Sequence, residues 1–280
     1  MLTSCGGTEL QNSPAAVVQY SATVDSLVQA AQHYWDNLNT TDTTNNSLKE
    51  KFIAYTEHLK AIPAESASQA VRQWMKQMEE HPRLSMKFHQ LALEVLYESN
   101  SPLLNEALYI PFAESGLEYS RLSELGKMQF THRLTVARKN NPGSIAGDFA
   151  YTTPDGKETT LHRTEGEQIM ILFYNPECDN CKATIARLHN DTTIARLTAQ
   201  KRLQPLMIYT EGNDEVWHNN KNNHPQGWLS GYDKSENISN RRIYELRAMP
   251  VIYLLDSNKR VILKNTTQKM LIAHFTKQHP

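Results

Sequence analysis

Cys178 and Cys181 are the side chains of this sequence whose type and spacing best suit them to chemistry. A cysteine thiolate is a nucleophile, and two cysteines at this spacing can cycle between a dithiol and a disulfide. In such a cycle Cys178 attacks a substrate disulfide, and Cys181 then attacks the mixed disulfide to release the product. The pair therefore predicts a thiol-disulfide oxidoreductase that acts without a cofactor.

The residues around the pair predict a strand that leads directly into a helix. Residues 169–174 are apolar or aromatic without interruption, a run too short to span a membrane and typical of a strand buried on both faces. Asn175 and Pro176 end the strand, because proline cannot donate to a central ladder. Helical spacing follows, so we expect Cys178 at a helix N-terminus, where unpaired N–H groups and the helix dipole stabilise a thiolate.

Length and charge limit the possible classes of protein. At 280 residues the chain is longer than most single domains, so two domains are expected. A net charge of −1 and the lack of any lysine-rich or arginine-rich block argue against a nucleic-acid partner. No run of apolar residues is long enough for a membrane helix, so membrane attachment would require a lipid.

The third cysteine, Cys5, is the candidate for that lipid. The segment Leu2-Thr-Ser-Cys5 resembles the end of a bacterial lipoprotein signal, in which the cysteine is lipidated and becomes the first mature residue. We therefore expect a lipid anchor at Cys5, a flexible tether over residues 1–17, and a location in the cell envelope facing the periplasm. The alternative is a stray exposed cysteine on a disordered tail, since the basic and apolar regions of a signal peptide do not precede it.

The hydrophobic pattern divides the rest of the chain into two domains. Residues 18–140 have helical periodicity and predict an all-α domain of unknown function. Asn140-Asn-Pro-Gly143 is a run of turn formers that marks the boundary, and residues 141–280 predict alternating strands and helices. The expected fold class is α+β overall, with an all-α domain followed by an α/β domain.

Two details of the helical domain are specific enough to check. A helix is expected to start at Pro102 with Ser101 as its cap, and Pro111 is expected to limit its length. A longer helix is expected over residues 118–139, with Leu125 and Met128 in its apolar rows.

The order of elements from residue 142 onward resembles the thioredoxin fold, and in particular its membrane-tethered TlpA-like and ResA-like branch. The features that carry the resemblance are a segment like Gly147-Asp-Phe149, a hairpin at Asp155-Gly156, the CxxC after a strand, and Met249-Pro250 before a strand pair. The resemblance implies that Pro250 is the cis-proline of this family, which faces the dithiol and presents backbone to the substrate. It also implies that the partners are protein thiols and disulfides, together with a redox partner that the sequence does not identify.

The helical domain carries a second resemblance. It is similar to an uncharacterised domain that precedes thioredoxin modules in Gram-negative envelope lipoproteins, and this similarity brings no known chemistry with it. The matching segments are Tyr34-Trp-Asp36, Ser101-Pro102, Asn105-Glu-Ala-Leu-Tyr-Ile110 and Asn140-Asn-Pro-Gly143.

The residues nearest the dithiol depart from the family pattern. Glu177 and Asp179 flank Cys178, and their negative charges disfavour the thiolate, so the site is expected to act as a reductant or exchange protein rather than a strong oxidant. The acids that relatives place near the second cysteine would fall at Leu172 and Thr184, so neither family base for Cys181 is present.

Other interpretations remain open at this point. The cysteines could form a structural disulfide in an envelope binding or scaffolding lipoprotein without catalysis. A zinc site is less favoured, because a closed site needs four ligands and no second pair at ligand spacing is present. A peroxiredoxin is also less favoured, because it needs a threonine three residues before its reactive cysteine, and this chain has Asn175 there.

Overall fold

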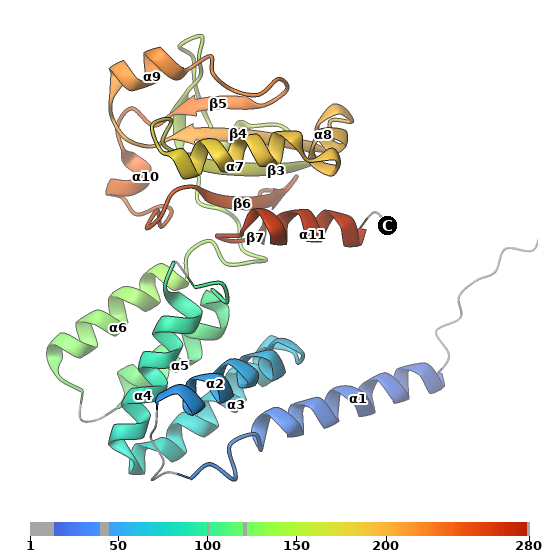
Figure 1. The fold of residues 1–280 in the computed structure, drawn as a ribbon, viewed down its shortest axis with the longest axis vertical. Helices are drawn as coiled ribbons and strands as arrows, with labels where there is room; N and C mark the ends of the chain where they lie inside the picture. The colour runs from blue at the N-terminus through green and yellow to red at the C-terminus, as the bar shows by residue number, and fades with distance from the viewer. Residues whose placement is uncertain (1–13, 40–44, 100, 120–121, 279–280) are drawn as a thin grey trace, which may run out of the picture. The chain divides into compact units, whose positions relative to one another are not determined.

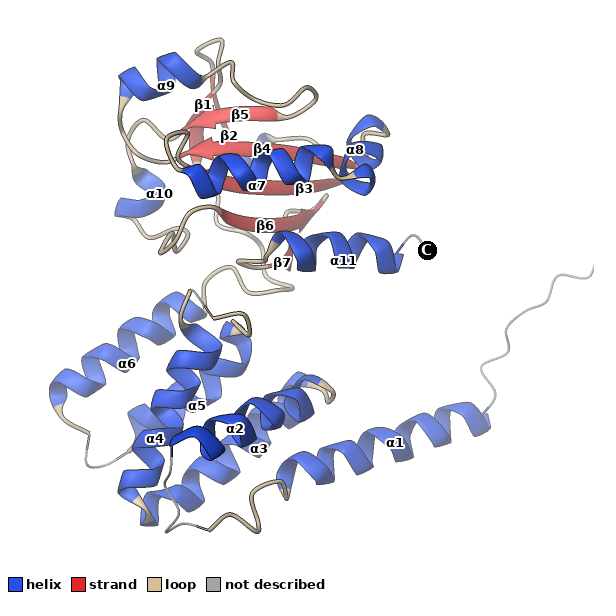
Figure 2. Ribbon diagram, in the orientation of Figure 1, coloured by secondary structure: helices blue, strands red, loops and turns tan. Residues whose placement is uncertain are grey.

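The computed structural model describes residues 14–39, 45–99, 101–119 and 122–278. Contacts divide the chain into two compact units, Met1–Leu134 and Thr135–Pro280. The first is helical and the second contains a mixed sheet, which confirms the predicted α+β class (Figures 1 and 2). Cys5 lies outside the described residues, and none of the described helices is long and apolar enough to cross a membrane.

An aromatic core holds the helical unit together. Trp35 stacks on Trp74 with ring centroids 5.5 Å apart, and Phe88 meets both rings edge-on. All three side chains are buried, and aromatic pairs in such geometries add to the stabilisation that comes from area burial alone. The helices around this core are α1 (Pro14–Gln32), α2 (Asn45–Lys60), α3 (Ala64–Gln77), α4 (Pro82–Ala92), α5 (Glu106–Glu118) and α6 (Glu124–Ala137), with a 3-10 turn at Met78–Glu80 and a π-helical turn at Leu93–Tyr97.

The helix expected at Pro102 starts later and does not stop at its proline. α5 begins at Glu106, capped by the Asn105 side chain, which accepts the N–H of Leu108 at 3.1 Å. Pro111 lies inside this helix, where the missing N–H removes one backbone hydrogen bond and burial of the ring offsets the loss. Ser101 instead donates its hydroxyl to the carbonyl of Val95.

The single long helix expected over residues 118–139 is also wrong. α5 ends at Glu118, and α6 starts at Glu124 after Ser123, whose hydroxyl accepts the N–H of Gly126 at 3.2 Å. This restart rotates the apolar row. Leu125 and Met128 are 65% and 69% exposed, while the helix buries Phe130 and Leu134.

The second unit is built on a seven-stranded sheet. The strands are β1 (Ala150–Thr152), β2 (Glu158–Thr160), β3 (Gln168–Tyr174), β4 (Leu203–Tyr209), β5 (Leu229–Tyr232), β6 (Val251–Asp256) and β7 (Val261–Leu263), and they lie in the order β2-β1-β5-β4-β3-β6-β7. β3 pairs in parallel with β4 and antiparallel with β6. The hairpin predicted around Pro154-Asp-Gly156 is confirmed as β1 and β2.

Both faces of β3 are covered, which explains its uninterrupted apolar sequence. Met170, Leu172 and Tyr174 point to one face and belong to a core shared with α7 (Asp179–Asn190), α8 (Thr192–Ala199) and α11 (Gln268–Gln278). Ile169, Ile171 and Phe173 point to the other face, against side chains that include Phe149 and Tyr244. Figure 1 shows α7 and α11 on the same side of the sheet.

Three helix boundaries complete the fold. The tether expected through residue 17 overlaps α1, which begins at Pro14, because proline suits a first helical position. The helix after the dithiol breaks at Asp191, whose side chain caps α8 by accepting the N–H groups of Thr193 and Ile194. α10 (Asn237–Asn240) is a single helical turn.

Candidate active site

Cys178 occupies the N-cap of α7, at the carboxyl end of β3. Its sulfur accepts the backbone N–H of Cys181 at 3.3 Å, and its own N–H donates to the carbonyl of Asn175 at 3.1 Å. The residue is half-buried, so the sulfur is anchored to the helix terminus and still accessible. An accessible sulfur that meets unpaired helix N–H groups is placed as a nucleophilic thiolate requires.

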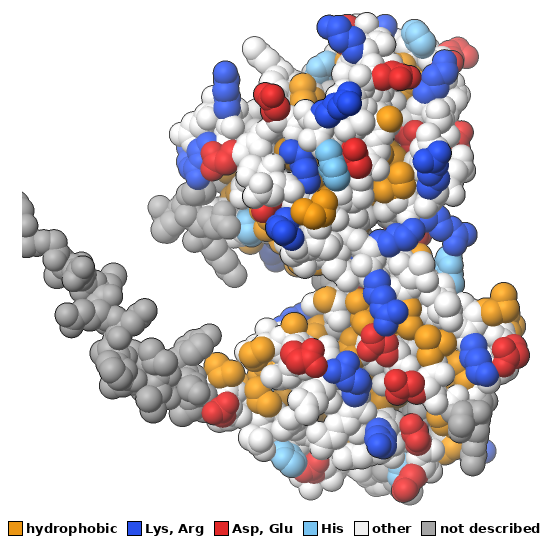
Figure 3. Space-filling model, turned by 180° about the vertical axis from the view of Figure 1, so that it is seen from behind, with side chains coloured by type: hydrophobic (Ala, Val, Ile, Leu, Met, Phe, Trp, Pro, Cys, Tyr) orange, Lys and Arg blue, Asp and Glu red, His pale blue; other side chains and the backbone are white. Residues whose placement is uncertain are grey.

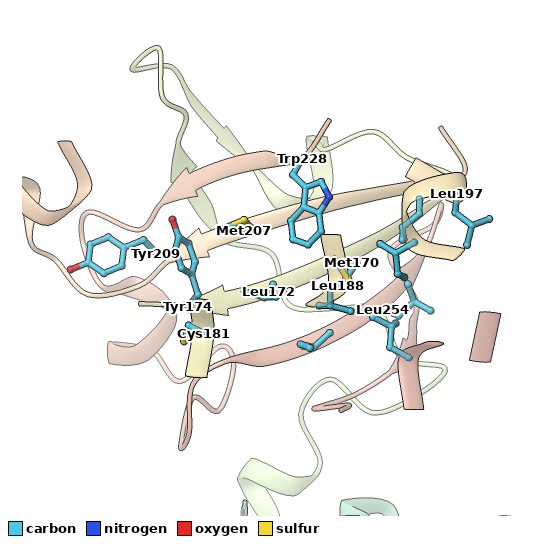
Figure 4. Packing of buried hydrophobic residues seen from close by; sticks show 14 of the residues in the cluster. Met170, Leu172, Tyr174, Cys181, Leu188, Leu197, Met207, Tyr209, Trp228 and Leu254 are labelled. Carbon is cyan, nitrogen blue, oxygen red and sulfur yellow. The ribbon is translucent and has the colours of Figure 1, made fainter. Parts of the chain in front are cut away.

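Cys181 lies one turn further along α7 and is wholly buried. Figure 4 shows its side chain next to Tyr174 at the end of β3. Burial, reinforced by a hydrogen bond with Cys178, raises the pKa of the Cys181 thiol to about 12, although the backbone N–H of Asn175 acts in the opposite direction. Cys181 is therefore a protonated thiol near neutral pH, and only a partner already bonded to Cys178 comes within its reach.

Pro250 reaches the dithiol through its neighbour Met249. The Met249–Pro250 peptide bond is cis, and the Asn180 side chain donates to the carbonyl of Met249 at 3.3 Å. The topology accounts for this meeting, because β6 runs antiparallel to β3 and Val251 pairs with Phe173. The start of β6 and the end of β3 thus lie at the same edge of the sheet, so the structure brings together Cys178, Cys181 and the proline loop.

Asn175 organises the loop between β3 and α7. Its side-chain amide donates to Glu211 at 2.8 Å, and its side-chain oxygen accepts the N–H of Glu177 at 2.7 Å. Its backbone carbonyl accepts the N–H of Cys178. Its backbone N–H forms a hydrogen bond that lowers the pKa of Cys181. All four polar groups of this residue are therefore engaged within the dithiol loop or with Glu211.

Glu211 is the site residue that the sequence analysis missed. It follows the end of β4 by two residues, as Pro176 follows the end of β3. Since β3 and β4 are parallel and Tyr174 pairs with Tyr209, these positions must be neighbours, and that register is the signal that could have identified the residue. The negative charge of Glu211 raises the pKa of Cys181 further, after burial and the contact with Cys178.

The acidic residues predicted near the dithiol are present, but their electrostatic effects differ. The Asp179 side chain is 99% exposed, with the ammonium of Lys182 at 3.4 Å, so solvent screens its charge. Glu177 and Glu211 are also exposed, and after burial their charges contribute to raising the pKa of Tyr209 to about 12. Leu172 and Thr184, where relatives carry an acid, are both buried. Among the described residues no group of His, Cys, Asp and Glu could hold a metal ion.

A row of tyrosines forms the sheet edge behind the dithiol. Tyr174, Tyr209 and Tyr232 occupy the same register position on the parallel strands β3, β4 and β5. The Tyr209 and Tyr232 rings stack with centroids 5.5 Å apart, and Trp217 stacks on Tyr232 at 5.3 Å. Trp217, Trp228 and Tyr232 are buried, so these three aromatic residues serve packing.

Comparisons with known proteins agree with this architecture. Residues 14–140 match the model of a domain of unknown function, DUF5106. A thioredoxin-like protein from Bacteroides caccae superposes with a TM-score of 0.84 at 29% sequence identity, covering 99% of this chain and 100% of that one. No curated protein matches the sequence.

Two partial matches come from Bacteroides fragilis. A conserved protein of unknown function is 36% identical, with a TM-score of 0.47, and covers 48% of this chain and 98% of its own. The C-terminal domain of an uncharacterized protein is 35% identical, with a TM-score of 0.48, and covers 49% of this chain and 98% of its own. From the fold and the full-length match, the chain has a thioredoxin-like fold that follows a helical domain of unknown function.

Proposed function

We propose that this protein is a thiol-disulfide oxidoreductase that acts on protein disulfides, with Cys178 as nucleophile, Cys181 as resolving cysteine and Pro250 as the platform for substrate backbone. One observation carries the proposal: the half-buried sulfur of Cys178 caps α7 and accepts the N–H of Cys181, whose own thiol is wholly buried. A substrate can therefore reach the Cys178 sulfur directly, whereas Cys181 can react only with a substrate that is already bonded to Cys178.

The reaction consists of two exchanges. The Cys178 thiolate attacks one sulfur of the substrate disulfide, the substrate S–S bond breaks, and the departing thiolate takes up a proton. Cys181 then loses its proton, attacks the Cys178 sulfur of the mixed disulfide and releases the second substrate thiol. The substrate gains two electrons and the protein holds a Cys178–Cys181 disulfide, which an external dithiol must reduce before the next cycle.

A reducing or exchanging role is the proposed direction. The negative charge of Glu211 adds to the burial that raises the pKa of Cys181, which disfavours the thiolate of that cysteine and so favours the disulfide at equilibrium. A redox titration against glutathione tests this direction, and a potential near that of strong protein oxidants would contradict it.

The cell envelope is the proposed location, with a lipid on Cys5 as the anchor. Its support is the sequence Leu2-Thr-Ser-Cys5. Mass spectrometry of the N-terminal peptide from the native host should find an acylated Cys5, and an unmodified cysteine there would remove the anchor from the proposal.

The test of the reaction compares three cysteine-to-serine variants in the reduction of a model protein disulfide, with dithiothreitol as electron donor. Cys178→Ser should lower the catalysed rate by at least about 100-fold, since the residual nucleophile is buried. Cys181→Ser should accumulate a mixed disulfide on Cys178, and Cys5→Ser is the matched control that should keep the parental rate. Parental activity in Cys178→Ser would contradict the assignment. A large loss of thermal stability on reduction, with no exchange activity in the parent protein, would instead indicate a structural disulfide.

A further inference from the structure

A groove lies next to the dithiol, between α7 and the segment that follows α9 (Asp214–Asn220). Its volume is about 380 Å³, toward the lower end of the roughly 300–1,000 Å³ usual for ligand pockets. The lining combines an apolar floor with polar side chains at its edge. The floor includes Tyr174, Ile185 and Met207, and the edge includes Asn175, Asn220 and Asn223.

The attacking sulfur and the groove share one face of α7. Cys178, Lys182, Ile185 and His189 are spaced four, three and four residues apart, which places them in one stripe along the helix. The last three line the groove, and Cys178 packs against the same core cluster as Ile185. With a rise of about 1.5 Å per residue, Lys182 lies about 6 Å along the axis from Cys178. The groove therefore begins about one helical turn from the reactive sulfur.

We infer, on the basis of the function proposed above, that this groove binds a bulky apolar side chain of the substrate polypeptide, one or two residues from its reactive cysteine. In a mixed disulfide the two Cβ atoms are about 3.8 Å apart, and each extended residue adds about 3.3–3.6 Å. A side chain at the second position from the substrate cysteine therefore spans the 6 Å to the groove. A small disulfide compound would leave most of it empty.

Charge favours the same occupant. Of the residues that line the groove, only Lys182 carries a fixed charge, and its ammonium pairs with Asp179 at 3.4 Å. The floor residues Tyr174 and Met207 are buried, so a guest side chain exchanges water for apolar surface. Around the sulfur itself, Glu177 and Glu211 disfavour an acidic substrate segment. The inferred substrate is thus apolar near its cysteine and not acidic.

The experiment uses two symmetric peptide disulfides and the Cys181→Ser background, which retains the adduct. Each half-peptide has a single cysteine and either phenylalanine or serine two residues away. Mass spectrometry then follows the formation of the Cys178–peptide disulfide, which releases one peptide thiol. Ala186→Trp fills the groove. Ala183→Trp is the matched control, because Ala183 is also an exposed alanine of the same helix but does not line the groove.

The phenylalanine peptide should react about tenfold faster than the serine peptide, because burying even part of an aromatic ring is worth a factor of this order. Ala186→Trp should reduce that preference to about twofold or less, and Ala183→Trp should keep it. Far-UV circular dichroism verifies folding, with Ala186→Leu as a milder replacement should the larger side chain disrupt it.

Equal rates for the two peptides in the parent background, or a preference that survives in a folded Ala186 variant, would overturn the inference and leave the proposed reaction standing. A small aromatic disulfide could also react faster with Cys178 than either peptide does, and Ala186→Trp could abolish that advantage. If the two peptides then reacted at equal rates, the assignment of a polypeptide substrate would be overturned. Failure of Cys178 to form an adduct with either peptide, while iodoacetamide still alkylates it, would overturn the proposed function itself.

Discussion

Buried aromatic side chains serve the two units of this chain in different ways. In the helical unit, Trp35, Trp74 and Phe88 pack on one another in the interior. In the thioredoxin-like unit, Tyr174 and Tyr209 stand side by side at the ends of parallel strands, next to the dithiol. In the thioredoxin-like unit, buried aromatic rings thus lie at the strand ends beside the dithiol, whereas in the helical unit they pack on one another.

The largest expected effect is a loss of stability on removing an aromatic ring from the helical core, without a change at the dithiol. Phe88→Ala removes a fully buried ring that contacts both tryptophans, so the free energy of unfolding of the helical unit should fall by about 3–5 kcal/mol. Alkylation of Cys178 in the same full-length variant should keep its parental rate. Denaturant titration measures the first quantity. Met86→Ala, on the same helix and 49% exposed, should cost about 0.5 kcal/mol or less.

A change in alkylation rate that parallels the loss of stability in Phe88→Ala would break the comparison, because it would make the helical core part of the reactive site.

The next effect concerns a buried histidine in the helical unit. Burial lowers the pKa of His89 to about 4, although a backbone hydrogen bond at Phe112 opposes this. Below its ordinary pKa of about 6.5 the unfolded chain binds the proton more readily, so stability is lost as pH falls from 6.5 toward 4, by up to about 3 kcal/mol. The free energy of unfolding at pH 7 and pH 4 measures this loss. His89→Gln should flatten the dependence, and His81→Gln should not.

Cys181 gives the opposite pH dependence in the other unit. Its pKa of about 12 means that the thiolate fraction, and with it the rate of resolution, rises about tenfold per pH unit, or about 100-fold between pH 7 and pH 9. The release of thiol from a mixed disulfide preformed on Cys178 measures this rate. A plateau below pH 8 would show that another group takes the proton. Because the folded-state pKa is raised, the reduced protein should also lose stability between about pH 8.5 and 12.

Glu211 should have the smallest effect. Glu211→Gln removes a negative charge that raises the pKa of Cys181, while the amide oxygen can still accept from Asn175. The resolution rate at pH 7 should rise about two- to fourfold, since a screened charge several ångströms away is worth a fraction of a kcal/mol to about 1 kcal/mol. Glu215→Gln is the exposed control. An unchanged or slower rate would contradict the electrostatic role of Glu211.

The surface contributes little to this contrast. On the face seen in Figure 3, acidic and basic side chains are interspersed over both units, in keeping with the net charge of −1. The differences between the units therefore arise from burial and from strand ends, which the four measurements above address directly.

Local patterns predicted the thioredoxin-like unit well. The run at residues 169–174 is β3, and the Asp155-Gly156 turn joins a hairpin. These features are written in consecutive residues. The family resemblance, rather than a local pattern, implied the cis bond at Met249–Pro250. Glu211 could not be identified in the same way, because it becomes a neighbour of the dithiol only through the parallel register of β3 and β4.

The helical unit was harder to predict, for a physical reason. Pro111 reads as a helix end, yet its buried ring packs well enough to keep it inside α5. Leu125 and Met128 follow a periodicity that is broken by the restart of α6 at Glu124. Both errors come from tertiary packing and capping overriding local propensity, which is common where helices have several possible faces.

The hydrogen bonds of Asn175 bear on how this site could be re-engineered. The loop is shaped from outside the CxxC, by the contacts that Asn175 makes with Glu177, Cys178 and Glu211. Of the two spacer residues, Asp179 is fully solvated and Asn180 makes one contact, to Met249. Substitutions at Asp179 should therefore leave the loop intact, whereas a substitution of Asn175 would remove hydrogen bonds that shape the loop.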